Sequence, residues 1–320
     1  MKNLINKIKR EITSLLVSPS VIKINHSVFL KVYDDAKKIY LDKYTDFSYD
    51  KYVIGQWLKN IKMMEDCFLN KFNFNFLRLP VIRNTMFATS TDSWVKNQMN
   101  YLENKVKNDE LKNLLIENNL GGPILTDFKY KTSTNSIHLL YHFIKFSEEM
   151  GAKLNNISNV IEFGGGYGDA AKIFKRMNKQ ATYTIIDLPI FSFLQLVYLK
   201  SIFGENEVVL VNKINDVQVG KINIIPFNIE KLKQLKEHIK NIDLFVSTWA
   251  LSETPDTMQD LIKSLNYFDA KYILMGYQKS NESFAYSENL KNVPENYKVI
   301  FNKETDYVKD NYYLFCQKIK

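Results

Sequence analysis

One short segment constrains the fold more than any other: an apolar run that leads into a glycine-rich turn and then into a helix. Residues 159–163 are typical of a buried strand, 164–168 (GGGYG) of a tight turn, and 170–177 of an amphipathic helix. Glycine permits positive φ angles and lets the backbone pass close to a ligand. A strand, a glycine turn and a helix in this order indicate an open α/β sheet, whose ligands bind at the carboxyl ends of the strands.

The rest of the second half of the chain keeps alternating between strand and helix periodicities. Because strands separated by helices form right-handed crossover units, the pattern predicts a Rossmann-like, doubly wound, mostly parallel sheet. The final two strands are joined by a polar turn without a helix, which predicts an antiparallel terminal strand. The expected helices are 134–150, 170–177, 191–203, 229–240 and 256–265, and the expected strands are 159–163, 181–186, 207–211, 221–226, 242–247, 271–276, 297–302 and 312–318.

The first 130 residues have a different character, because apolar residues recur there with helical spacing and strand patterns are scarce. The expected helices are 2–17, 29–44, 50–69 and 92–118, the last capped by Asp92 and stopped by Gly121. We therefore expect two domains. Residues 1–130 form a helical region that we interpret as a substrate-binding cap, and residues 131–320 form the α/β domain.

Composition excludes several classes of protein. The formal charge is +8, but only four of the 43 basic residues are Arg and no basic block occurs, so we expect no nucleic-acid partner. Two cysteines cannot build a disulfide framework or a four-cysteine zinc site. No apolar run approaches the ~18–20 residues of a transmembrane helix, and the basic start lacks the apolar core of a signal peptide. We expect a cytoplasmic protein.

The spacing of the glycines decides which ligand the turn favours. A dinucleotide fingerprint needs G-x-G-x-x-G, and its third glycine would fall on Asp169. The observed pattern is acidic-x-G-x-G-x-G, made by Glu162, Gly164, Gly166 and Gly168. A carboxylate directly before the turn would repel a pyrophosphate. It suits a ligand that has an ammonium group and no phosphate, such as S-adenosylmethionine.

A second acidic residue supports the same ligand. Asp187 lies 19 residues after Gly168, at the end of the second expected strand of the α/β domain. A carboxylate at this position can accept hydrogen bonds from both ribose hydroxyls, and Leu188 and Pro189 can flank an adenine. The alternative is a tight structural turn with an unrelated surface aspartate.

These motifs resemble the class I S-adenosylmethionine-dependent methyltransferases, over roughly residues 134–320. That family's sheet also ends with an antiparallel strand. Many members have an aspartate after the third strand that binds the adenine amine, and this chain has Asn228 there. The cofactor-binding residues that the resemblance implies are Glu162, Gly164, Gly166, Gly168, Asp187, Leu188, Asn228 and Ser247.

Two segments together narrow the resemblance. Residues 161–169 (IEFGGGYGD) and 247–253 (STWALSE) are similar to the bacterial sugar O-methyltransferases that modify surface glycans. The resemblance implies methyl transfer to a sugar hydroxyl in the synthesis of capsule, lipopolysaccharide or similar precursors, with a sugar or nucleotide sugar as the acceptor. Trp249 suits stacking on an apolar sugar face, and Tyr141 and Gln278 are further candidates for the acceptor site.

An alcohol is a poor nucleophile, so a general base is expected. His138 and His142 lie four residues apart and share one face of their helix, and Glu253 is the alternative base. The histidine spacing resembles that of zinc proteases, but Leu139 stands where those proteases need a glutamate, so we predict no metal.

Three alternatives stay open at this point. The same cofactor would serve methylation of an amine or a small non-sugar molecule, and the positive charge leaves RNA as a weaker alternative. An oxidoreductase is disfavoured because the dinucleotide glycine spacing is absent. The oligomeric state is open, and a homo-oligomer is compatible with the sequence.

Overall fold

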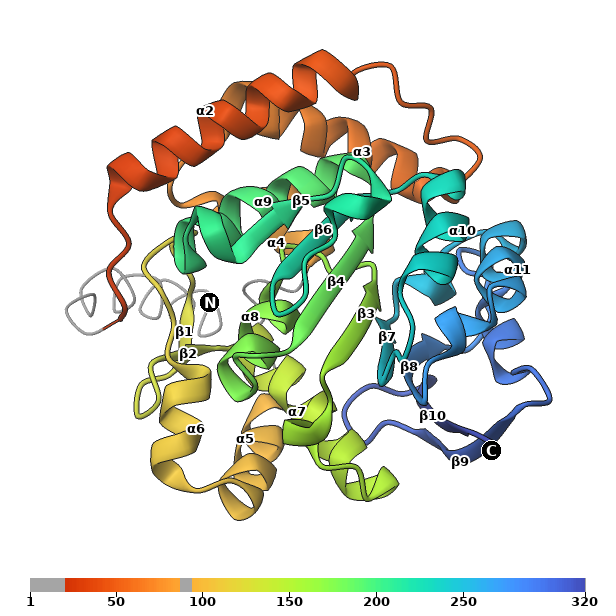
Figure 1. The fold of residues 1–320 in the computed structure, drawn as a ribbon. Helices are drawn as coiled ribbons and strands as arrows, with labels where there is room; N and C mark the ends of the chain where they lie inside the picture. Colours follow the sequence, from red (N-terminus) through yellow and green to blue (C-terminus); the bar gives the residue numbers. More distant parts are fainter. Residues whose placement is uncertain (1–20, 87–93, 320) are drawn as a thin grey trace.

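An eight-stranded sheet runs through the centre of the computed structural model, which describes residues 21–86 and 94–319 (Figure 1). The first six strands in spatial order are parallel, and β10 pairs antiparallel with both β8 and β9. This arrangement confirms the predicted Rossmann-like sheet with its antiparallel terminal strand. From edge to edge the strands are β5 (Val208–Leu210), β6 (Ile222–Pro226), β4 (Thr182–Asp187), β3 (Asn159–Phe163), β7 (Leu244–Thr248), β8 (Tyr272–Gln278), β10 (Asn311–Lys318) and β9 (Tyr297–Glu304).

Helices cover both faces of this sheet. Successive strand residues point to opposite faces, and on β3 Val160 packs in one hydrophobic cluster while Ile161 packs in the other. Both faces of the parallel strands are therefore apolar, as a doubly wound sheet requires. The first face is covered by α7 (Thr134–Met150), α8 (Asp169–Met177) and α9 (Pro189–Phe203), and the second by α10 (Ile229–His238) and α11 (Asp256–Ser264).

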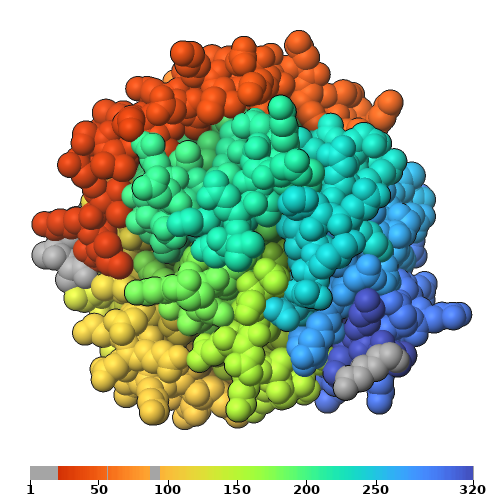
Figure 2. All heavy atoms as spheres, viewed as in Figure 1, coloured from red at the N-terminus to blue at the C-terminus, as the bar shows by residue number. Residues whose placement is uncertain are grey.

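The N-terminal helices extend the hydrophobic cluster of the first face. Tyr40 on α2 and Phe193 on α9 have ring centroids 5.2 Å apart, and α5 packs on α7. Figure 2 shows the red and orange N-terminal residues as a layer beside the green ones. None of the described helices is long and apolar enough to cross a membrane. The N-terminal helices are α2 (His26–Lys43), α3 (Gly55–Asp66), α4 (Pro80–Thr85), α5 (Trp94–Lys105) and α6 (Asn108–Leu115), and a π-helical segment, Cys67–Lys71, follows α3.

Some predicted boundaries in this region are wrong. The long helix expected at 92–118 is two helices, because Lys107 adopts an extended conformation and begins α6. A short hairpin of β1 (Leu125–Asp127) and β2 (Thr132–Ser133) was not predicted, and it spans the boundary expected at residue 130. The helix expected at 2–17 and the cap expected at Asp92 lie outside the described residues. The division into two domains stays a prediction.

Candidate functional site

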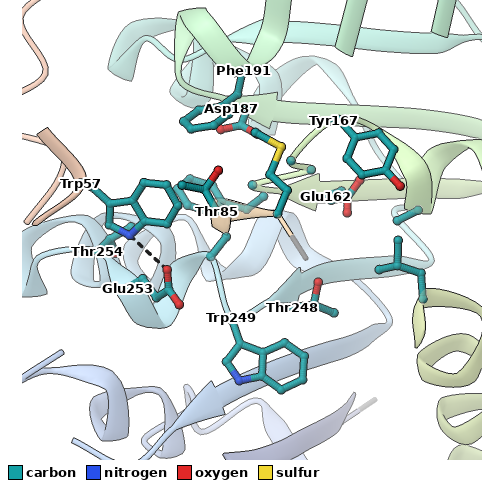
Figure 3. Close-up of a pocket in the computed structure, with 18 of the residues that line it drawn as sticks. Trp57, Thr85, Glu162, Tyr167, Asp187, Phe191, Thr248, Trp249, Glu253 and Thr254 are labelled. Atoms are coloured by element: carbon teal, nitrogen blue, oxygen red, sulfur yellow. Dashed lines mark hydrogen bonds between the residues drawn. The ribbon is translucent and has the colours of Figure 1, made fainter. Parts of the chain in front are cut away.

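A cavity of about 550 Å³ lies at the carboxyl ends of the central parallel strands (Figure 3). Residues at the ends of five neighbouring strands line it: Phe163, Asp187, Phe227, Thr248 and Gln278. This is the edge at which ligands bind in doubly wound sheets, and the volume is typical of small-molecule sites. We take this cavity as the candidate active site.

The glycine turn forms one wall of the cavity, and three of its four glycines have positive φ angles. Gly164 has φ +79°, and a Cβ atom there would lie 2.1 Å from the Cβ of Ala250, so the loop after β7 requires its absence. Gly166 has φ +57°, and among the described residues its Cβ would meet Met86 alone, at 3.9 Å. Gly168, with φ +96°, is the N-cap of α8, and a Cβ atom there would lie 2.8 Å from the side chain of Leu199. Contrary to the prediction, it is not among the residues that line the cavity.

Glu162 lies beneath the glycine turn with only 2% of its surface exposed. The hydroxyl of Tyr183 donates a hydrogen bond of 3.0 Å to its Oε2. Burial is the main cause that raises the pKa of Glu162 to about 8, and the neighbouring carboxylates of Asp187 and Asp169 contribute to this rise. A ligand that brought a positive charge to this end of the cavity would favour the ionised form of Glu162.

Asp187 ends β4 and is tied to the glycine turn through Gln195. Its carboxylate accepts a hydrogen bond of 2.8 Å from the backbone N–H of Leu188 and one of 2.7 Å from Nε2 of Gln195. The same Nε2 donates to the carbonyl of Gly166 at 3.0 Å. Burial raises the pKa of Asp187 to about 7. Gln195 therefore fixes the spacing between the carboxylate and the turn.

Sequence reasoning missed Gln195, although a signal was present. It is the single amide in the apolar run FLQLVYL of α9 and is fully buried. A buried amide almost always has hydrogen-bond partners, so its position within two helical turns of Asp187 was informative.

Sequence reasoning also missed a buried ion pair that supports the turn. Lys172 is fully buried and its Nζ lies 2.5 Å from Oδ1 of Asp169 and 2.8 Å from Oε2 of Glu117. Asp169 lines the cavity and accepts a further hydrogen bond of 3.0 Å from Asn135, which lines it too. Through Lys172, the first residue of α8, Asp169, is linked to Glu117 in the segment after α6. These ion pairs fix the position of α8 behind the glycine turn.

Five rings form what we call the aromatic box, at the other end of the cavity. Its residues are Trp94 on α5, His138 and His142 on α7, Trp249 after β7, and Tyr307 between β9 and β10, and all of them line the cavity. Ring centroids lie 4.9 Å apart for Trp94 and His138, 4.9 Å for His138 and Tyr307, and 5.4 Å for His142 and Trp249. The predicted pair of histidines is thus part of the cavity wall, with centroids 4.1 Å apart.

Both histidines are held in the neutral form. Burial lowers the pKa of His138 to about 3, and its Nδ1 lies 3.0 Å from Oε1 of Gln98. Burial, with His138 alongside, lowers the pKa of His142 well below its usual value. Nδ1 of His142 hydrogen-bonds the hydroxyl of Tyr313, and its Nε2 is buried with no partner among residues 21–86 and 94–319.

Glu253 lines the side wall of the cavity beside Trp57 of α3 (Figure 3). The indole Nε1 of Trp57 donates a hydrogen bond of 3.0 Å to Oε2 of Glu253. Burial raises the pKa of Glu253 to about 7. Of the three predicted bases, Glu253 is the one whose pKa lies closest to neutrality, which is the condition for general-base catalysis near pH 7.

The predicted acceptor residue Trp249 is held in one orientation. Its φ is +66°, its Nε1 donates a hydrogen bond of 2.5 Å to Asn311, and its ring lies against Gly276, where a Cβ atom would come within 2.9 Å. Gln278 also lines the cavity, and its Oε1 accepts a hydrogen bond of 2.8 Å from Ser252. These two predicted residues therefore do lie at the site.

Besides Gly168, three further predicted residues are not among those that line the cavity. Asn228 uses its amide oxygen to cap α10, and its neighbour Phe227 lines the cavity instead. Ser247 is buried and its hydroxyl donates to the carbonyl of Phe163, which ties β7 to β3. Tyr141 is buried, with its hydroxyl 3.3 Å from Asp306.

An apolar wall lies beyond Asp187. Leu188, which the sequence predicted, lines it together with Phe191 and Phe227, which it did not. Tyr52 contacts Phe227 with ring centroids 4.8 Å apart. This wall is suited to a planar ring such as a nucleobase.

Within the described ranges, 21–86 and 94–319, no group of three or more His, Cys, Asp or Glu side chains is arranged to hold a metal ion. The absence of a metal from the reaction stays a prediction.

Comparison with known proteins gives similarities to solved structures at low identity. The mitomycin 7-O-methyltransferase MmcR matches with a TM-score of 0.37 and 10% identity, over 58% of this chain and 55% of that chain. Magnesium protoporphyrin IX methyltransferase (ChlM) from Synechocystis PCC 6803 with bound SAM matches with a TM-score of 0.39 and 10% identity, over 72% and 100%. TrmK of M. capricolum in complex with S-adenosylhomocysteine matches with a TM-score of 0.36 and 15% identity, over 55% and 68%.

No protein-family model matches the sequence, and no curated protein is significantly similar to it. At these identities and TM-scores, the structural similarities do not assign an activity or a ligand to this chain. The function is therefore argued from the cavity itself.

Proposed function

We propose that this protein is an S-adenosylmethionine-dependent methyltransferase that acts on a sugar hydroxyl. One observation carries the proposal: the acidic glycine turn after β3 and Asp187 at the end of the adjacent β4 line the same cavity. The turn offers bare backbone for the amino acid part of the cofactor, and Asp187 offers a carboxylate for the ribose hydroxyls.

The residues present fit this cofactor. Among the described residues that line the cavity, four are carboxylates and none is Lys or Arg. A ligand with an ammonium and a sulfonium is attracted by such a wall, whereas a dinucleotide would place its pyrophosphate against it. The apolar wall of Leu188, Phe191 and Phe227 fits the adenine. The proposed contacts are Glu162 and the turn for the amino acid part, and Asp187 for the ribose.

When bound, the cofactor supplies an electrophilic methyl group; its sulfur leaves as a neutral thioether and the acceptor hydroxyl loses its proton. The chain's main contribution is alignment, since positioning can supply roughly 7–11 kcal/mol of the barrier. We propose that Glu253 takes the proton, because its pKa of about 7 leaves much of it ionised at neutral pH. The bond from Trp57 favours that ionised form and orients the carboxylate.

The acceptor class rests on the aromatic box and on the sequence resemblance. Apolar faces of sugar rings stack on aromatic side chains, and Trp249 is held rigidly in a position to offer such a face. With the STWALSE segment, this supports a role in the synthesis of surface glycans. The buried free thiols of Cys67 and Cys316 agree with a reducing compartment, and we propose a cytoplasmic location.

We also propose that the N-terminal helical region acts as the substrate-binding cap. Tyr52, Trp57, Met86 and Trp94 from this region all line the cavity. The region thereby supplies one wall of the acceptor site in addition to its packing on α9.

The experiment that tests the cofactor is calorimetric titration with S-adenosylhomocysteine, with NADH as the competing ligand. We expect saturable binding of the former only. Asp187→Ala should weaken it by about 1.5–3 kcal/mol, the usual worth of a hydrogen bond to a charged group. The matched control is Asp260→Ala, which removes an exposed carboxylate on α11. Binding of NADH alone would refute the proposal.

A further inference from the structure

The described wall of the cavity has no Lys or Arg side chain, although the chain is rich in both. The sequence has 43 Lys and Arg residues, yet none of them is among the described residues that line the cavity. The buried Lys172 is already paired with Asp169 and Glu117, and Lys279, next to Gln278, lies 4.0 Å from Asp310. A phosphate that entered the cavity would thus face carboxylates without a partner of opposite charge.

The histidines of the aromatic box do not replace the missing cations. Gln98 and Tyr313 hydrogen-bond them, and Trp94, Trp249 and Tyr307 contact their rings. None of these neighbours carries a charge that would favour a protonated imidazole, and burial lowers the pKa of both histidines. The box is therefore an uncharged surface.

Hydrogen bonds within the protein hold the box in place. Tyr307 donates to the hydroxyl of Tyr313 at 3.3 Å, and this hydroxyl hydrogen-bonds Nδ1 of His142. Nε2 of His142, and Nε2 of the neighbouring cavity residue Gln278, are buried and have no partner in the described part of the chain. The aromatic faces of the box are therefore its main contribution to the cavity.

We propose that the acceptor, given the proposed methyltransferase function, is an uncharged hydroxylated ring that carries no phosphate in the cavity. Aromatic faces, and the absence of Lys and Arg from the described residues that line the cavity, together favour a glycoside or a residue of an assembled glycan over a nucleotide-activated sugar. In the order of reactions, methylation then follows the glycosyl transfer that removes the nucleotide.

The test compares acceptors that share the sugar and differ in whether its anomeric oxygen carries a nucleoside diphosphate or a methyl group. The full chain is incubated with S-adenosylmethionine and with matched pairs: methyl glycosides of glucose, galactose and N-acetylglucosamine, and the uridine-diphosphate forms of the same sugars. Methyl transfer is followed by mass spectrometry, and binding of S-adenosylhomocysteine is measured beforehand. We expect kcat/KM for a glycoside to exceed that for its nucleotide form by about 100-fold or more, because like charges would otherwise face each other.

A pair of variants separates the aromatic box from general damage. Tyr307→Leu should weaken binding of the glycoside at least tenfold and leave the affinity for S-adenosylhomocysteine unchanged. Tyr286→Leu removes an exposed tyrosine with 44% of its surface accessible and serves as the matched control.

The outcomes are distinguishable. If S-adenosylhomocysteine does not bind, the proposed function itself fails. If it binds but the nucleotide sugars are the better substrates, only the acceptor proposal is overturned. Methylation of an amine in place of a hydroxyl, or no methylation of any sugar in the panel, also overturns it.

Discussion

Gln195 should strengthen binding of the proposed cofactor, and a single substitution tests this. In Gln195→Leu the side chain keeps nearly the same volume but loses the Nε2 donor, which bonds Asp187 at 2.7 Å and the carbonyl of Gly166 at 3.0 Å. A hydrogen bond to a charged group contributes about 1.5–3 kcal/mol. Since 1.4 kcal/mol corresponds to a factor of ten, we expect S-adenosylhomocysteine to bind roughly 10–100-fold more weakly at pH 7.

The pH dependence distinguishes this positioning role from a general loss of stability. The Gln195 bond lowers the pKa of Asp187, which burial has raised to about 7. Without that bond the carboxylate is less ionised at pH 7, and raising the pH to 9 should restore part of the lost affinity. Calorimetric titration at both pH values measures this.

The control is Gln259→Leu, which alters another fully buried glutamine, on α11 at the opposite face of the sheet. The affinity of this control variant for S-adenosylhomocysteine should change far less than that of Gln195→Leu, and it should not recover when the pH is raised to 9. The reasoning would be refuted if Gln195→Leu bound S-adenosylhomocysteine as tightly as the wild type at pH 7. It would also be refuted if the variant lost equal affinity at pH 7 and pH 9.

Three further predictions follow from the site. Glu253→Gln should lower kcat by about 10²–10⁴-fold with little change in KM, and wild-type kcat should rise with pH through about 7; a flat profile would exclude Glu253 as the base. Glu162 and Asp187 have folded-state pKa values of about 8 and 7, above their values in the unfolded chain. The free energy of unfolding that these groups contribute is therefore present at low pH and lost as the pH rises through 7–8. Denaturant unfolding should therefore give a lower free energy of unfolding at pH 9 than at pH 7. Calorimetric titration with S-adenosylhomocysteine at pH 7, in buffers of different ionisation enthalpy, should show that binding releases protons from these carboxyl groups. Lys172→Met should lower the free energy of unfolding by about 3–5 kcal/mol, because it leaves Glu117 buried without its cation; a loss below 1 kcal/mol would contradict that account.

The fold was predictable because it rests on local periodicity. The strand at 159–163 and the helix at 134–150 have the predicted bounds, since long runs of one period leave little ambiguity. The division of the 92–118 segment was not predictable in this way. The apolar residues on both sides keep helical spacing, and two residues, Val106 and the extended Lys107, separate α5 from α6.

The site was predictable in part, because some of its residues follow directly from the predicted order of strands and helices. The glycine turn and Asp187 follow from the order of strands, so their place at one edge of the sheet is a consequence of topology. Contacts between distant segments carry no such signal: Trp57 meets Glu253 across 196 residues of sequence. Tyr141 shares α7 with the two histidines, but the rotation of the helix turns it toward Asp306 and away from the cavity wall.

The aromatic box differs from the glycine turn in how the chain builds it. The turn and Asp187 come from one unbroken stretch, residues 162–187, in which a change at one residue disturbs its neighbours. The box is assembled from α5, α7, the loop after β7 and the connection between β9 and β10. None of these segments includes residues 162–187, so a substitution in the box leaves the sequence of the proposed cofactor-binding stretch unchanged. Laboratory evolution of acceptor choice should accordingly begin at Trp94 and Tyr307, which lie outside the parallel strands.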